Sequence, residues 1–242
     1  MLETHTIFDK DESASKTQTH HVTQVKEAVR DQNRVNIYVD DKFYCSLDIS
    51  QVVDFSIKIG RKLSDAELAE LKRASDFGKF YARALEYVLM RPHSIKEIRD
   101  YLKRKTLSKK IRVKNRKTGE YQTKVQEGCD PSLVPLVLKR LEERGYLDDY
   151  RFAELWVENR SIKKGISPKK LRNELARKGI AQSIIEEVLQ KSSRDERDEL
   201  RKVITRKANR YADRQKLIQY LVRQGFNYSD VLEELASSSD GA

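Results

Sequence analysis

The side chains of this sequence that could do chemistry are, above all, its lysines and arginines. The 242 residues include 49 lysines and arginines against 38 aspartates and glutamates, which leaves a formal charge of +11. The excess is concentrated, because residues 103–124 contain ten basic residues and one acidic residue. A dense cluster of cations is typical of a surface that binds a polyanion, so we expect nucleic acid as a partner.

Within this basic stretch, apolar and polar residues alternate as they do in β-strands. The alternation covers Ile111 to Lys114 and Tyr121 to Val125, and Lys117-Thr118-Gly119-Glu120 between them supplies turn residues. We therefore predict a β-hairpin with one cationic face, inserted over residues 107–130. We expect its basic residues to bind DNA or another partner: Lys109, Lys110, Arg112, Lys114, Arg116, Lys117 and Lys124.

Residues that could form an active site are sparse. The sequence contains no Gly-x-x-x-x-Gly-Lys-Ser/Thr phosphate loop, no His-Glu-x-x-His pair and no Gly-x-Ser-x-Gly turn. The tandem Asp148-Asp149 could hold a metal ion, but it stands where a helix begins, so N-capping explains it more simply. His93 follows Pro92 in an expected interhelical turn, where we expect a capping or exposed role. We predict no catalytic residue, no cofactor and no metal, and therefore no enzyme.

The two cysteines and the hydropathy pattern bear on the cellular compartment. Cys45 and Cys129 share no metal-binding spacing and form no Cys-x-x-Cys motif, which suits a reducing compartment. The N-terminal residues lack a signal-peptide pattern, and no apolar run approaches the roughly 18 residues that would suggest a membrane span. We expect a cytoplasmic protein without a membrane partner.

The predicted elements are mainly helices, because nine glycines and four prolines are few for this length. Residues 1–21 are polar and aperiodic, so we expect a disordered tail. Residues 22–76 should form a β/α unit, in which strand-like segments from Val22 to Ile49 make a small antiparallel sheet. Ser64, with Glu67 three residues later, has the capping-box arrangement that starts a helix.

Three later segments resemble one another: SIKEIRDYLKRK from Ser94, SPKKLRNELARKG from Ser167 and DRQKLIQYLVRQG from Asp213. Each places two apolar residues four positions apart on one helical face, and a further helix is expected before and after each segment. The predicted fold is therefore mainly α, a tandem array of three three-helix repeats with the hairpin inserted in the first. We place the repeats at residues 77–148, 149–193 and 194–242.

The segment GYLDDYRFAELWVENRSIKKGISPKKLRNELARKGI, from Gly145 to Ile180, resembles the central signature of the RecX family, the regulators of RecA recombinase. ALEYVLMRPHSIKEIRDYLKRK from Ala84 resembles the family's first repeat, and RVNIYVDDKFYCSL from Arg34 is similar to the N-terminal strands of longer members. The similarity covers residues 22–236, and the hairpin insert is the main departure. The matching positions of the central signature are Gly145, Tyr146, Leu147, Asp148, Asp149, Phe152, Ala153, Trp156, Val157, Arg160, Gly165, Leu171, Glu174, Leu175, Lys178, Gly179 and Ile180.

This resemblance implies a non-enzymatic modulator that binds RecA filaments on single-stranded DNA and inhibits RecA's ATP hydrolysis and strand exchange. We expect a monomer, because a repeat array needs no partner to complete its core. Single-stranded and also double-stranded DNA are further expected partners. We expect the filament to contact basic residues of the second repeat: Arg160, Lys163, Lys164, Lys169, Lys170, Arg172 and Lys178.

Two alternatives stay open at this point. The repeats could act as helix-turn-helix units that bind duplex DNA without RecA. Asp148 and Asp149 could also serve a metal-dependent hydrolase, although N-capping accounts for them.

Overall fold

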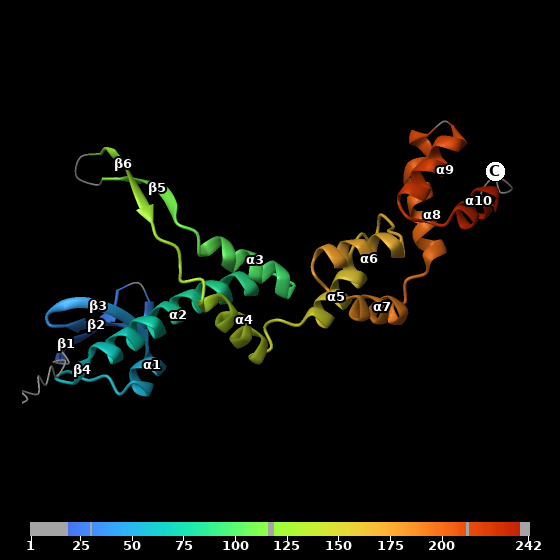
Figure 1. The fold of residues 1–242 in the computed structure, drawn as a ribbon. Helices are drawn as coiled ribbons and strands as arrows, with labels where there is room; N and C mark the ends of the chain where they lie inside the picture. Colours follow the sequence, from blue (N-terminus) through green and yellow to red (C-terminus); the bar gives the residue numbers. More distant parts are fainter. Residues whose placement is uncertain (1–18, 30, 116–118, 212, 238–242) are drawn as a thin grey trace, which may run out of the picture. The chain divides into compact units, whose positions relative to one another are not determined.

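The computed structural model describes residues 19–29, 31–115, 119–211 and 213–237 (Figure 1). The chain divides into two compact units, residues 1–80 and 81–242. Most of the expected tail, residues 1–18, lies outside the described residues. None of the helices in the described part is long and apolar enough to cross a membrane.

The first unit contains a four-stranded antiparallel sheet with the strand order β3-β2-β1-β4. The first strand begins three residues before the expected start at Val22, because Thr19 to His21 pair with the short strand β4. The His20 imidazole also contacts the carboxylates of Asp40 and Asp65, at 2.7 and 3.0 Å. The strands are β1 (Thr19–Ala28), β2 (Asp31–Val39), β3 (Lys42–Asp48) and β4 (Lys62–Ser64).

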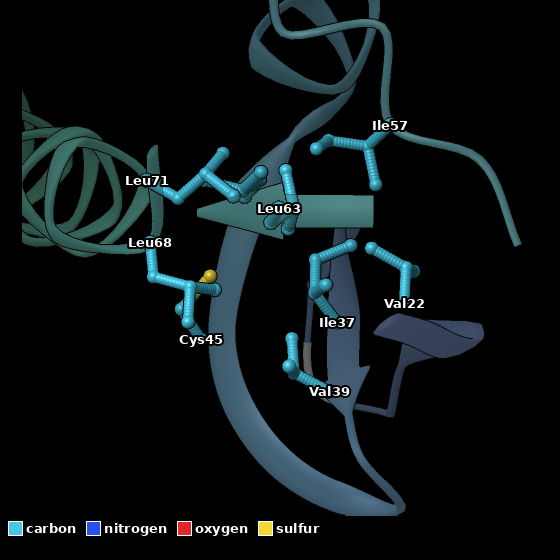
Figure 2. Packing of buried hydrophobic residues seen from close by; sticks show 9 residues of the cluster. Val22, Ile37, Val39, Cys45, Ile57, Leu63, Leu68 and Leu71 are labelled. Atoms are coloured by element: carbon cyan, nitrogen blue, oxygen red, sulfur yellow. The ribbon is translucent and has the colours of Figure 1, made fainter. Parts of the chain in front are cut away.

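The core of the first unit lies between this sheet and the helix α2 (Asp65–Leu89). Figure 2 shows Leu68 and Leu71 of this helix near Cys45 and Leu63 of the sheet. A short helix, α1 (Ile49–Asp54), follows β3. The buried residues of this core are Val22, Ile37, Val39, Cys45, Leu47, Ile57, Leu63, Leu68 and Leu71.

Helix α2 is one continuous helix of 25 residues, and it crosses the boundary that we expected between residues 76 and 77. The start is correct, because the Ser64 hydroxyl accepts from the Glu67 N–H and the Glu67 carboxylate accepts from the Ser64 N–H. Gly78 lies within the helix, and its missing side chain lets Gln51 and Arg34 pack closely against the backbone.

The second unit contains the end of α2, eight further α-helices of the described chain and the inserted hairpin. In the first repeat, α3 (Ile95–Lys105) and α4 (Leu133–Glu143) flank the strands β5 (Lys109–Lys114) and β6 (Tyr121–Gln126). The later helices are α5 (Asp149–Asn159), α6 (Pro168–Arg177), α7 (Gln182–Lys191), α8 (Glu196–Lys207), α9 (Arg214–Arg223) and α10 (Tyr228–Ser237), and a 3₁₀ turn η1 (Ala208–Arg210) follows α8.

The three central helices α3, α6 and α9 bury the apolar pairs by which the segments were aligned. Leu102, Leu175 and Leu221 each have no exposed surface, and their partners one turn earlier are exposed by at most 5%. In the second and third repeats the pair packs with the flanking helices of its own repeat, and the predicted mainly α fold is confirmed. The earlier partners are Ile98, Leu171 and Leu217.

Consecutive repeats are joined by a contact that occurs twice. The Ser94 hydroxyl accepts from the N–H of Glu97 and donates to the Lys178 carbonyl at 2.7 Å. At the equivalent place in the next repeat, the Ser167 hydroxyl accepts from the N–H of Lys170 and donates to the Gln224 carbonyl at 2.6 Å. Each serine therefore starts its own helix and satisfies the last carbonyl of the next central helix.

Two glycines make this approach possible. Gly179 and Gly225 follow the two carbonyls and adopt positive φ angles of 83° and 96°. A Cβ at Gly179 would lie 2.7 Å from the Lys96 side chain, and one at Gly225 would lie 2.7 Å from the Ser167 hydroxyl. Any other residue would therefore clash with the preceding repeat and strain the backbone.

We predict that Ser167→Ala lowers the free energy of unfolding by about 1–3 kcal/mol, because it removes a helix cap and leaves the Gln224 carbonyl without its buried donor. Urea denaturation followed by circular dichroism measures this loss. Ser183→Ala, at an exposed position of α7, is the matched control and should change stability by less than about 0.5 kcal/mol. Equal stability of the two variants would contradict the role given to Ser167.

Candidate nucleic-acid interface

The hairpin of β5 and β6 is exposed along both strands. Its register pairs Lys110 with Val125, Arg112 with Thr123 and Lys114 with Tyr121. Because directly paired residues of an antiparallel ladder share a face, these six side chains lie together. The opposite face carries Lys109, Ile111 and Val113 with Gln122, Lys124 and Gln126.

The expectation of one cationic face is therefore wrong in part. Lys110, Arg112 and Lys114 share a face, whereas Lys109 and Lys124 lie on the other. The alternation within each strand was evident from the sequence, but the register between strands depends on the length of the connecting turn. Arg116 and Lys117 lie outside the described residues.

The face with three cations also carries an aromatic side chain. Tyr121 is 61% exposed, and the Arg112 guanidinium lies 5.2 Å from the centre of its ring. Among the described residues, no carboxylate forms an ion pair with any of the five hairpin cations. Free cations beside an exposed aromatic ring are the groups that bind phosphates and stack on unpaired bases.

At the base of the hairpin, a groove joins it to α2 and α3. Tyr87 and Tyr101 stack with their ring centres 4.0 Å apart and nearly parallel, and the Lys105 ammonium lies 5.1 Å from the centre of the Tyr101 ring. His93 packs on Tyr87 and is buried, so the expectation of a capping or exposed residue is wrong. Burial lowers the pKa of its imidazole. The basic residues that line the groove are Arg83, Arg104, Lys105 and Lys109.

The basic residues expected to bind the partner in the second repeat do not form one uniform surface. Three of them have carboxylate partners inside the chain. Arg160 forms a two-pronged pair with Glu174, at 2.8 and 3.1 Å, and Lys178 pairs with Glu97 at 2.8 Å. Arg172 pairs with Glu186 in the same two-pronged way.

The remaining four are exposed and have no carboxylate partner among the described residues. Lys170 donates to the side-chain carbonyl of Gln224 at 2.8 Å, and the stem of Lys169 lies against Gly225. Lys163 and Lys164 lie in the turn between α5 and α6. Of these four, Lys164, Lys169 and Lys170 adjoin residues of the third repeat.

The third repeat adds cations that the sequence analysis did not select. A hollow between the second and third repeats is lined by Arg206, Lys207 and Arg210, together with Lys164 and Lys170. The sequence contains a signal for them, since residues 206–210 hold three basic residues. Basic residues are also common at a helix C-terminus, where they stabilise the helix. Only the tertiary structure therefore distinguishes cations that serve the helix end from cations that line a ligand site.

The aspartate pair has structural roles in the described chain. Asp148 is the N-cap of α5 and accepts from the N–H groups of Tyr150 and Arg151, as expected. Asp149 instead accepts from the N–H of Ile95 in the preceding repeat, at 2.9 Å. Loss of solvent raises the pKa of the Asp149 carboxyl. No group of three or more possible metal ligands occurs among the residues that the structure describes.

A partly buried ion pair between Glu97 and Lys178 joins the first and second repeats. Partial burial opposes ionisation of Glu97, but hydrogen bonds from Lys178 and Arg91 outweigh it and hold the pKa of this carboxyl below its ordinary value. The Lys178 ammonium also lies 4.1 Å from the centre of the Trp156 ring. Trp156 is half-buried and packs against the core of its repeat.

Comparison with known proteins identifies relatives over both units. Residues 148–189 match the family model for "RecX, second three-helix domain", and residues 20–64 match the "Regulatory protein RecX N-terminal domain". The chain is 28% identical to Regulatory protein RecX of Bacillus licheniformis over 91% of this chain and 78% of the relative. It is 30% identical to Regulatory protein RecX of Bacillus subtilis over 69% of this chain, and the match spans 55% of that relative.

Solved structures show the same fold. A crystal structure of regulatory protein RecX aligns with a TM-score of 0.67 at 22% identity, over 87% of this chain and 96% of that one. The crystal structure of RecX from Lactobacillus salivarius aligns with a TM-score of 0.51 at 21% identity, over 68% of this chain and 97% of that one.

We predict that Glu97→Gln destabilises the protein at pH 7 and that the difference from wild type decreases as the pH falls below about 4.5. A carboxyl whose pKa is depressed in the native state stabilises the fold above its unfolded-state pKa, and that contribution is lost as it becomes protonated. Urea denaturation at pH 7 and near pH 4 measures both values. Glu154→Gln, at an exposed position without an ion pair in the described chain, is the control, and a pH-independent difference for Glu97→Gln would contradict the assignment.

Proposed function

This chain belongs to the RecX family of regulatory proteins, and we propose that it acts by binding RecA nucleoprotein filaments and inhibiting RecA's ATPase and strand-exchange activities. In this proposal the protein is a monomeric cytoplasmic regulator of DNA repair and recombination, without catalytic activity of its own. The observation that carries it is a set of cations, on the hairpin and beside the third repeat, that have no carboxylate partner among the described residues.

Unpaired cations on a rigid surface serve binding better than catalysis. Ion pairing inside the chain already occupies Arg160, Arg172 and Lys178, which therefore stabilise the repeats. Lys163, Lys164, Lys169 and Lys170 keep their charge available to an acidic filament surface or to its DNA. Such charges attract a polyanion over long distances and contribute to the rate of association as well as to affinity.

The hairpin supplies an auxiliary DNA contact in this proposal. Residues two apart on one strand face are separated by about 6.8 Å, so Lys110, Arg112 and Lys114 form a row of charges. Tyr121 on the same face adds a ring on which an unpaired base can stack. This combination favours single-stranded over double-stranded DNA, because only unpaired bases expose their faces.

The alternative, in which the repeats bind duplex DNA as helix-turn-helix units without RecA, is less well supported. A recognition helix reads bases with its N-terminal residues. The first turns of α3 and α6 are covered, since Ser94 and Lys96 contact the end of α6, and Ser167 and Lys170 contact the end of α9. Sequence-selective duplex binding without RecA would nevertheless favour this alternative over the filament proposal.

The central test is a titration of the protein into RecA assembled on single-stranded DNA, with ATP turnover followed at two salt concentrations. We expect turnover to fall in proportion to the protein added, and we expect more protein to be required at the higher salt concentration because unpaired cations contribute to binding. Unchanged ATP turnover at saturating protein would overturn the proposed function.

A second prediction concerns the hairpin. If about five of its charges meet phosphates, deletion of residues 108–128 should weaken DNA binding and flatten the slope of log K against log salt by about 4. The narrower variant Lys110→Gln/Arg112→Gln/Lys114→Gln should flatten the slope on a single strand by about 2, since each lost phosphate contact contributes about 0.7. Fluorescence anisotropy with a labelled oligonucleotide measures both slopes.

The opposite face of the hairpin provides the comparison. Lys109→Gln/Lys124→Gln removes two charges from the same strands but leaves the row beside Tyr121 intact, so its effect should be smaller and base stacking should persist. A slope that is unchanged in the deletion variant would remove the hairpin from the DNA contact.

A further inference from the structure

The hollow between the second and third repeats brings together cations from three separate segments. Lys164 comes from the turn after α5, Lys170 from the first turn of α6, and Arg206, Lys207 and Arg210 from the end of α8 and the following 3₁₀ turn. Arg160 and Glu174 also line it. Six basic side chains and one acidic side chain therefore surround the same hollow.

The single carboxylate in the hollow does not neutralise this charge. Glu174 is held by both prongs of Arg160 and by the Trp156 indole N–H at 3.2 Å, so it is fully engaged. Among the described residues, no carboxylate forms an ion pair with the other five basic side chains of the hollow. Lys207 instead lies 5.5 Å from the centre of the Tyr220 ring, and desolvation together with the charges of Arg210 and Arg206 lowers the pKa of its ammonium group.

A helix C-terminus attracts cations, but this effect accounts for only part of the cluster. It explains Arg206 and Lys207 in the last turn of α8. It does not explain why Lys164 and Lys170, from the preceding repeat, face the same hollow. Mutual repulsion of unpaired charges costs free energy, and a native fold that retains it at a concave site is organised to receive an anion.

The equivalent place between the first and second repeats shows that the repeat architecture does not require this charge. Positions of the first repeat correspond to positions 73 residues later in the second repeat. Glu97 therefore occupies the position that corresponds to Lys170, and its carboxylate binds both Lys178 and Arg91. Likewise, the positions that correspond to Arg160 and Glu174 are occupied by Tyr87 and Tyr101, whose rings stack on each other. At the first junction Glu97 thus pairs with both Lys178 and Arg91, whereas five of the six cations at the second junction have no carboxylate partner in the described chain. Both junctions use the same serine contact.

We propose that the hollow between the second and third repeats is a phosphate-binding site that takes a ligand with several adjacent phosphate charges. The cations lie around the hollow on three separate segments and do not form a single two-pronged binding group. A tetrahedral phosphate presents oxygens in several directions and can bind all of them, whereas a planar carboxylate matches a single guanidinium. The ligand chemistry is a polyphosphate or a run of phosphodiesters. This inference deepens the proposed function, because Lys164 and Lys170 of the hollow also carry that proposal, but it is tested without RecA.

Isothermal titration calorimetry with inorganic tripolyphosphate tests the site directly. We expect one tripolyphosphate per chain, and Arg206→Gln/Arg210→Gln should weaken binding at least tenfold. Arg214→Gln/Lys216→Gln removes the same charge from exposed positions of α9 outside the hollow and should change the affinity less than twofold. Glutamine preserves helical propensity, and circular dichroism verifies that both variants fold.

Competition separates the sources of the phosphate. Displacement of tripolyphosphate by a nucleoside triphosphate assigns the site to a nucleotide, and displacement by a single-stranded oligonucleotide but not by the nucleotide assigns it to a nucleic-acid backbone. Three results would overturn the proposal: no saturable binding of tripolyphosphate, equal weakening in both double variants, or preferential binding of an oligoglutamate peptide. Because no step of this assay contains RecA, its outcome is distinguishable from that of the ATP-turnover test.

Discussion

The arrangement of the repeats depends on a hydrogen bond between a buried serine and the end of a neighbouring helix. Four carbonyls at the C-terminus of any α-helix lack intrahelical donors, and burying one without a partner is costly. Ser94 and Ser167 are both fully buried, and each donates to such a carbonyl in the following repeat. Since the same hydroxyl also caps its own helix, one atom links the start of one central helix to the end of the next.

This contact determines which side chains of successive repeats meet. It places Glu97 beside Lys178 at the first junction and Lys170 beside Gln224 at the second. The geometry of the two junctions is therefore equivalent while their charge differs. Lys178, Arg160 and Arg172 use their charge to stabilise the fold, whereas Lys164, Arg206 and Arg210 have no such use within the described chain. Comparison of the two junctions thus distinguishes cations that stabilise the fold from cations that are available to a ligand.

The hairpin obeys a different constraint, because both of its faces are exposed and no core specifies its register. Lys110, Arg112 and Lys114 of β5 share a face with Tyr121, Thr123 and Val125 rather than with Lys124. A two-stranded ribbon of this kind contributes little to stability by itself. Its retention of exposed apolar and cationic side chains is consistent with a surface that is covered when a polyanion binds.

Sequence alone was sufficient for the features that depend on local periodicity and capping. The apolar pairs at four-residue spacing predicted the three central helices and their buried faces, and Ser64 with Glu67 predicted the start of α2 correctly. The insertion was evident because the spacing from Ile98 to Leu171 exceeds that from Leu171 to Leu217. Family membership was also accessible, since the residues from Gly145 to Ile180 retain the signature of the RecX family.

Other features were decided only by tertiary structure, because they depend on distances between residues far apart in the chain. The close packing of Gln51 and Arg34 against Gly78 of α2 joins residues that are distant in the sequence. Whether a lysine or arginine is paired depends on a carboxylate in another helix, as Lys178 and Glu97 illustrate, 81 residues apart. Charge composition therefore indicated a polyanion partner, whereas folding determined which cations remain available to bind it.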